Sequence, residues 1–126
     1  MTITTIDATA VAESYLAAWN EVDATTRAAL VQGAWSSDCT YTDPIAEAAG
    51  HEAIVGLIGA VQHQFPGCAF RLLGNVDGHH DVLRFRWELV PADGSDAPIV
   101  GFDVIELDSD GRIRNVFGFL DKVPSA

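Results

Sequence analysis

The change of hydrophobic period at Pro66-Gly67 constrains the fold of this 126-residue chain more than any other feature. Before it, apolar residues recur every three or four positions, which is the spacing typical of helices. After it, short strand-like stretches alternate with glycine-containing turns. Three helical segments followed by a run of strands indicate an α+β fold, with the helices packed on one face of an antiparallel sheet. The length favours a single domain over residues 1–126.

The helical segments are located by their caps and their apolar stripes. Asp7 and Asp23 are predicted to be N-cap residues. The stripes are Val11, Tyr15, Trp19 and Val22, then Leu30, Val31, Ala34 and Trp35, then Ile54, Leu57, Ile58, Val61 and Phe65. A short strand from Cys39 to Asp43 is expected between the second and third helices, and Pro66-Gly67 ends the third.

Four strands are predicted after Gly67, at residues 68–76, 79–91, 98–107 and 112–120. Turns that contain glycine join them as antiparallel hairpins. The last two strands are apolar on both faces, so that Phe102 and Phe117 alternate with Ile105 and Val116. The helices can cover only one face, and a large exposed apolar patch usually marks an interface. We therefore expect a homodimer that forms through the outer face of the sheet.

The composition limits the partners of the chain. Seven basic and eighteen acidic residues give a formal net charge of −11, which argues against nucleic acid and acidic membrane surfaces as partners. No apolar run approaches the length of a membrane span, and the N-terminus does not resemble a secretory signal, so a cytoplasmic location is expected. Cys39 and Cys68 match neither a metal-binding spacing nor a disulfide framework, and are expected to be buried free thiols.

Asp43 is the first candidate for chemistry. It lies at the end of the predicted strand in Tyr41-Thr42-Asp43-Pro44, immediately before a proline that cannot continue strand pairing. A carboxylate at the mouth of a strand that faces a helix is well placed to move protons in a pocket. The alternative is that Asp43 only starts a turn, as Asp-Pro pairs often do.

Four motifs together resemble the nuclear transport factor 2-like superfamily: Tyr15-Leu16-Ala17-Ala18-Trp19-Asn20, Tyr41-Thr42-Asp43-Pro44, Gly50-His51-Glu52-Ala53-Ile54 and Asp110-Gly111-Arg112-Ile113. Its members include ketosteroid isomerase, limonene epoxide hydrolase, scytalone dehydratase and the SnoaL-type polyketide cyclases. The resemblance implies a cone-shaped fold, in which three helices pack on a strongly curved antiparallel sheet around an internal pocket. The scaffold hosts many unrelated reactions, so it does not specify one.

The resemblance to ketosteroid isomerase implies roles for individual residues. The tyrosine that donates to the oxyanion falls on Tyr15, the general base on Asp43, and the protonated acid on Asp103. The tyrosine that supports the first donor falls on Ile58, so this chain departs from the pattern there. The predicted substrate pocket consists of Trp19, Trp35, Leu57, Ile58, His80, Arg86, Val116 and Gly118. Trp87 is a further residue that could line an apolar pocket.

The pairing of the last strands leaves the state of Asp103 open. If Ala92 pairs with Ala97, Arg86 lies opposite Asp103, and an ion pair keeps the carboxylate ionised. A bulge would shift the register by one residue and replace Arg86 by Phe85 or Trp87. The same counting places Gly101 opposite Gly118, which would either leave room for a ligand or let the sheet bend.

His80 shares the strand parity of Arg86 and is a candidate second base, or a solvated strand-end histidine. His79 and His80 would point to opposite faces of a strand, so no metal site is expected. No nucleotide fingerprint is present, and no cofactor is expected. The predicted function is an isomerase or cyclase that uses acid–base chemistry on a small, mostly apolar carbonyl compound. The alternatives are water addition, as in an epoxide hydrolase, with Arg86 and Asp103 acting on water, and a non-catalytic binding module for a small molecule.

Overall fold

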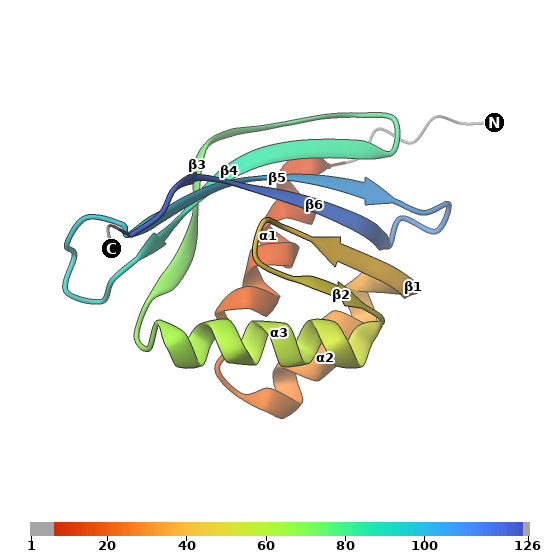
Figure 1. The fold of residues 1–126 in the computed structure, drawn as a ribbon. Helices are drawn as coiled ribbons and strands as arrows, with labels where there is room; N and C mark the ends of the chain where they lie inside the picture. Colours follow the sequence, from red (N-terminus) through yellow and green to blue (C-terminus); the bar gives the residue numbers. More distant parts are fainter. Residues whose placement is uncertain (1–6, 125–126) are drawn as a thin grey trace.

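The computed structural model describes residues 7–124 and contains three helices in the first half of the chain (Figure 1). They are α1 (Ala8–Asn20), α2 (Ala24–Ala34) and α3 (His51–Gln64). Asp7 and Asp23 are the N-caps, as predicted, because their carboxylates accept hydrogen bonds from backbone N–H groups of the first helical turn at 3.0 and 2.8 Å. Gly50 precedes α3 with a φ of 85°, a left-handed conformation that glycine adopts without strain.

The strands form one six-stranded sheet with the order β2-β1-β6-β5-β4-β3. The strands are β1 (Trp35–Thr42), β2 (Glu47–Ala49), β3 (Ala69–His79), β4 (Val82–Val90), β5 (Ile99–Leu107) and β6 (Ile113–Lys122). The sheet is mostly antiparallel. The predicted antiparallel pairing holds for every pair of neighbouring strands except β1 and β6, which pair in parallel. The reason is that α3 carries the chain from β2, at one edge of the sheet, to β3 at the other, so that β1 and the last strand become neighbours.

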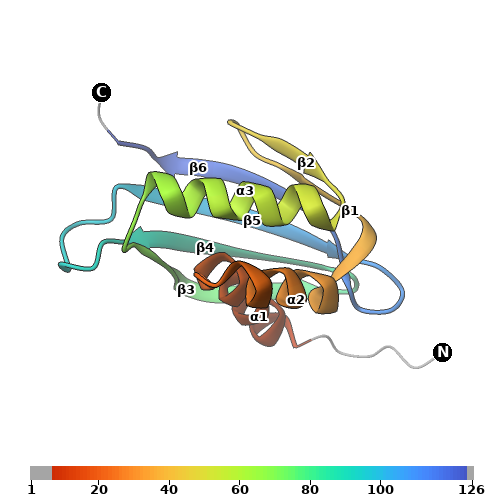
Figure 2. The same cartoon turned by 90° about the horizontal axis from the view of Figure 1, so that it is seen from below.

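All three helices lie on one face of the sheet, which gives the α+β arrangement that the change of period predicted (Figure 2). The core lies between the two layers. Side chains from every layer are fully buried there, among them Tyr15, Trp35, Ile54, Ile58, Phe85 and Ile105. None of the helices between residues 7 and 124 is long and apolar enough to cross a membrane.

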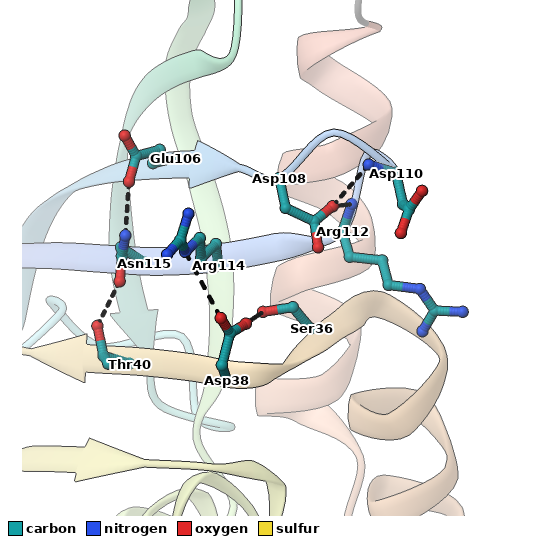
Figure 3. Close-up of polar contacts among 9 residues, drawn as sticks. All are labelled: Ser36, Asp38, Thr40, Glu106, Asp108, Asp110, Arg112, Arg114 and Asn115. Carbon is teal, nitrogen blue, oxygen red and sulfur yellow. Dashed lines mark hydrogen bonds and ion pairs between the residues drawn. The ribbon is translucent and has the colours of Figure 1, made fainter.

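The opposite face of the sheet is open in the described part of the chain. Phe117 and Phe119 are 44% and 55% exposed, and the Phe119 ring packs against Phe102 with ring centroids 6.3 Å apart. Beside these aromatic residues, Glu106, Asn115 and Thr40 form a hydrogen-bonded row across β5, β6 and β1 (Figure 3). The outer face therefore carries an apolar patch next to a polar row.

The hairpin between β3 and β4 differs from the prediction. Asp77-Gly78 was expected to form the turn, but β3 continues through it to His79, and the pairing shifts between Leu73 and Asp77. The turn is at His80, whose φ is 50°. The local Asp-Gly signal marks the end of an irregular stretch within the strand, because pairing with β4 outweighs the local turn preference.

Candidate functional site

A cavity of about 220 Å³ lies between the helices and the inner face of the sheet. Aromatic side chains form much of its wall: Tyr15, Trp19, Tyr41, Phe65, Phe70 and Trp87. Phe70 packs edge-on against both Trp19 and Trp87, with ring centroids 5.4 and 5.1 Å apart. The exposed side chains of Ile45 and Val123 lie at its rim. The site is therefore an apolar hollow, smaller than the pockets of roughly 300 Å³ or more that hold drug-sized ligands.

Asp103 brings a carboxyl group into this hollow from β5. It is 2% exposed, and Tyr15 Oη donates to its Oδ2 at 2.8 Å. Its other oxygen, Oδ1, is buried and has no hydrogen-bond partner among residues 7–124. The pKa of Asp103 is raised to about 7, chiefly by burial; the charge of Asp43 contributes to the rise, while the Tyr15 hydroxyl and the nearby Trp87 N–H oppose it. Asp103 can therefore exist as a protonated acid or as a carboxylate near neutral pH.

Asp43 reaches the same hollow from the end of β1. Its Oδ1 accepts hydrogen bonds from the backbone N–H groups of Ile45 and Ala46, both at 2.8 Å, and Tyr41 Oη donates to its Oδ2 at 2.6 Å. Both interpretations of Asp43 thus describe part of its position, because one oxygen holds the turn while the side chain lines the cavity. A carboxylate oxygen has two lone pairs, so Oδ2 can accept a second hydrogen bond or a proton.

Gly118 of β6 lies between the two carboxyl groups. A methyl group at this position would lie 3.0 Å from Asp103 Oδ1 and 3.2 Å from Asp43 Cβ. Asp103 pairs directly with Gly118, and the Asp43 side chain approaches from the neighbouring strand. Any larger residue would crowd both acids. Gly118 was predicted to belong to the pocket, and it lies where the two acids meet.

The two tyrosines act as hydrogen-bond donors. Burial raises the pKa of Tyr15 well above its usual range, and the neighbouring Asp103 raises it further. Burial also raises the pKa of Tyr41, with added contributions from Asp103 and Asp43. Both phenols therefore remain protonated at neutral pH. Tyr15 donates to Asp103 and Tyr41 donates to Asp43, so each acid has its own tyrosine.

Arg86 does not pair with Asp103, so the first of the two registers left open does not occur. Phe85 lies opposite Asp103, and Arg86 pairs with Phe102. A shift of one residue moves a side chain to the other face of the sheet, so Arg86 points to the outer face. There Arg86 Nε lies 3.5 Å from Asp121 Oδ2, and the Arg86 side chain is half exposed. The alternative with a shifted register, which places Phe85 beside Asp103, is the one observed.

Two further positions lie away from the expected place. His80 is exposed in the β3–β4 turn, with its ring against His79, because β3 is longer than predicted. Gly101 is opposite Leu120 and not Gly118, because the β5–β6 pairing differs by two residues from the count. Arg86 and His80 are therefore not part of the cavity wall in the described chain.

The remaining predicted pocket residues divide into two groups. Trp19 and Leu57 line the cavity. Trp35, Ile58 and Val116 are buried in the core behind it and are not among the described residues of the wall.

Sequence reasoning missed Tyr41 and Phe70 as parts of the site. Tyr41 was recognisable, because residues two apart on a strand share a face and Tyr41 is two before Asp43. Phe70 carried no such signal. Its place in the wall depends on the pairing of β3 with β4.

The fold and the site together define a class of protein. The three helices on a six-stranded, mostly antiparallel sheet are those of NTF2-like proteins, and the sequence pattern of the SnoaL-like domain matches residues 12–116. The chain belongs to the SnoaL-like family.

Solved structures agree with this assignment. A proposed isomerase of the SnoaL-like family from Agrobacterium tumefaciens is 44% identical, with a TM-score of 0.87 over 90% of this chain and 97% of the other. A proposed SnoaL-like polyketide cyclase from Jannaschia sp. is 15% identical, with a TM-score of 0.70 over 96% and 92%. A protein with a cystatin-like fold from Nostoc punctiforme is 15% identical, with a TM-score of 0.73 over 96% of each chain. No curated protein sequence matches the chain.

Proposed function

We propose that the protein is an isomerase or cyclase that needs no cofactor and uses acid–base chemistry on a small, mostly apolar carbonyl compound. The proposal takes the cavity as the internal ligand pocket of a cone-shaped fold, with both carboxyl groups on the concave side of the sheet. One observation carries it. Asp103 is buried in an apolar hollow, with Oδ2 held by Tyr15 and Oδ1 without a partner in the described chain. The relative from Agrobacterium tumefaciens, described as a proposed isomerase, supports the reaction class.

In this mechanism Asp43 is the general base. It removes a proton from the carbon next to the carbonyl group and receives it on Oδ2, beside the hydrogen bond from Tyr41. Asp103, in its protonated form, donates from Oδ1 to the carbonyl oxygen and stabilises the negative charge that develops there. Returning the proton from Asp43 to another carbon completes isomerisation. In cyclisation the enolate carbon attacks a second carbonyl carbon of the same molecule, the π bond of that carbonyl opens, and its oxygen takes the proton from Asp43.

Tyr15 has a different role from the one that the resemblance implied. Its hydroxyl donates to Asp103 Oδ2, so it is a positioning residue that orients the acid. Water addition with Arg86 as a partner is not proposed, because Arg86 lies on the outer face with Asp121.

Proton exchange tests the proposal. The protein is incubated in deuterated water with a panel of enones and cyclic ketones, and exchange at the carbon next to the carbonyl is followed by NMR. Asp43→Asn keeps an oxygen that can accept the turn hydrogen bonds of Ile45 and Ala46 but removes the base. We expect exchange to slow by at least about a hundredfold, the usual contribution of such a group.

Two results would contradict the proposal. Equal exchange by Asp43→Asn and the parent would remove Asp43 from the mechanism. No exchange by the parent on any member of the panel would contradict the activity and favour a non-catalytic binding module. Asp121→Asn, which changes an exposed carboxylate on the outer face, is the matched control and should exchange like the parent.

We also propose that the protein is a homodimer, with the outer face of the sheet as the interface. The exposed aromatic side chains of Phe117 and Phe119 support this, since a contiguous apolar patch of this kind usually meets a partner.

A further inference from the structure

Besides Asp103 Oδ1, the cavity wall contains two buried indole N–H groups without a partner in the described chain, those of Trp19 and Trp87. The Trp19 N–H lies near Tyr15, and the Trp87 N–H lies near Asp103. The indole Nε1 of Trp87 is buried and has no hydrogen-bond acceptor within residues 7–124. Leaving a buried donor unpaired is costly, so such atoms are rare unless a ligand or water uses them. Trp87 lines the cavity, as does Asp103 with its unpartnered Oδ1.

These two unpartnered atoms lie on the same side of the same pair of strands. Trp87 is opposite Gly101, and Asp103 is two residues further along β5, so the two side chains are diagonal neighbours on the inner face. Hydrogen bonding with the nearby Trp87 N–H lowers the pKa of Asp103, although the indole and the carboxyl do not reach the geometry of a formed hydrogen bond. Tyr15, by contrast, already donates its only proton to Asp103 Oδ2.

Gly101 explains why the indole can lie there. A methyl group at Gly101 would overlap the Trp87 ring, since its nearest neighbours would be three atoms of the six-membered part of the indole. The ring is thus seated directly on the β5 backbone. The absence of a side chain at Gly101 therefore makes room for the Trp87 ring, with its N–H near Asp103, which is a use of this glycine other than bending the sheet.

We infer that Trp87 Nε1 and Asp103 Oδ1 together bind one oxygen atom of the ligand, a carbonyl oxygen or the enolate oxygen derived from it. This inference rests on the proposed function, and it assigns to Trp87 the donor role that the resemblance implied for Tyr15. The indole N–H always donates. Asp103 donates when protonated and accepts when ionised, so a phenol or an enol can also occupy the site by donating to the carboxylate.

A matched pair of probes tests the oxygen site without turnover. 2-Naphthol carries one oxygen on a planar apolar frame, and naphthalene has the same frame without it. Binding of both to the parent, Trp87→Phe and Trp35→Phe is measured by calorimetry. Trp35 is the control, because its Nε1 is also buried without a partner in the described chain, while the residue is not part of the cavity wall.

We expect Trp87→Phe to weaken 2-naphthol binding about tenfold, which corresponds to about 1.4 kcal/mol and is typical of one hydrogen bond. Naphthalene binding should be nearly unchanged, and Trp35→Phe should leave the ratio of the two affinities as in the parent. Equal weakening of both probes by Trp87→Phe would show that only packing was lost and would overturn the inference. Unchanged 2-naphthol binding by this variant, or no 2-naphthol binding by the parent, would also overturn it.

A measurement on the parent protein covers the case in which Trp87→Phe does not fold. The three indole N–H signals in a ¹⁵N–¹H spectrum are assigned with Trp19→Phe and Trp35→Phe, which leaves Trp87 by elimination. 2-Naphthol should move the Trp87 proton signal downfield, and naphthalene should not. A Trp87 signal that responds equally to both probes would refute the hydrogen bond. Because neither experiment needs catalysis, a failure here is distinguishable from a failure of the exchange assay with Asp43→Asn.

Discussion

The burial of Asp103 predicts that replacing it with asparagine stabilises the protein at high pH. The folded protein favours the neutral acid, because burial raises the pKa of Asp103 from 3.8 to about 7. Five residues face this group: Tyr15 of α1, Tyr41 of β1, Asp43 just after β1, Trp87 of β4 and Gly118 of β6. None of them carries a positive charge, so the ionised form has no counter-charge among its described neighbours.

The sign follows from proton linkage. Between pH 3.8 and about 7 the folded state binds a proton at Asp103 that the unfolded state has released, so stability falls as pH rises through this window. Over the whole range between the two pKa values, the loss of stability is about 4 kcal/mol, at 1.36 kcal/mol per pH unit. Roughly 2–3 kcal/mol of it falls between pH 5 and pH 8. Asparagine resembles the neutral acid in shape and does not titrate, and its oxygen can still accept from Tyr15.

The assay is urea denaturation of the parent and Asp103→Asn at pH 5, 6, 7 and 8. The free energy of unfolding of the variant, relative to the parent, should rise by roughly 2–3 kcal/mol from pH 5 to pH 8. Other acids with shifted pKa values titrate in both proteins and cancel in the difference. Asp121→Asn serves as the control and should show no such rise. A relative stability that is constant within about 0.5 kcal/mol, or that falls with pH, would refute the assignment of a raised pKa to Asp103.

Two more predictions concern assembly and the packing of the helices. If the outer face forms the homodimer, light scattering at micromolar concentration should give twice the 13.5 kDa monomer mass. Phe119→Asp should give the monomer, whereas Val22→Asp, at an 81% exposed site on the α1–α2 loop, should leave the dimer intact. A monomeric parent would contradict the interface. Arg27 is buried, and its guanidinium donates hydrogen bonds to the Glu21 and Val22 carbonyls and to the Gln62 side chain. Arg27→Met removes these bonds and should lower the free energy of unfolding, measured by urea denaturation, by about 2 kcal/mol. Arg84→Met removes an exposed ion pair with Asp77 and should cost no more than about 1 kcal/mol; an equal loss for both variants would contradict the role given to Arg27.

The helices and the fold class were predictable because the signals are local. Asp7 and Asp23 cap their helices through side-chain bonds to residues three positions away, and each helix carries its own apolar stripe. The resemblance to the superfamily named Tyr15, Asp43 and Asp103, and the structure places all three on one cavity. Without it, nothing in the sequence connects Tyr15 to Asp103, which lie 88 positions apart.

The register of the sheet was not predictable, because it depends on loops and on strand pairing across the whole sheet. The loop between Val90 and Ile99 differs by one residue from the symmetric count, and this one residue decides whether Arg86 or Phe85 lies beside Asp103. The packing of the Trp87 ring on Gly101 could not be predicted for the same reason. A sequence shows that a glycine is present, but only the register shows which side chain fills the space above it.

The insertion of β6 between β1 and β5 determines when the site can assemble as the chain is synthesised. β1 joins the main sheet only through β6, and contacts such as Thr40 with Asn115 span 75 positions of sequence. Until β6 has emerged from the ribosome, β1 and β5 each expose an unpaired edge, a state that is prone to pairing with other chains. Docking of this strand closes both edges and brings Asp43 and Asp103 to either side of Gly118 in the same step. The two acids therefore come together late in folding, because the pairing of strands far apart in sequence is a slow step.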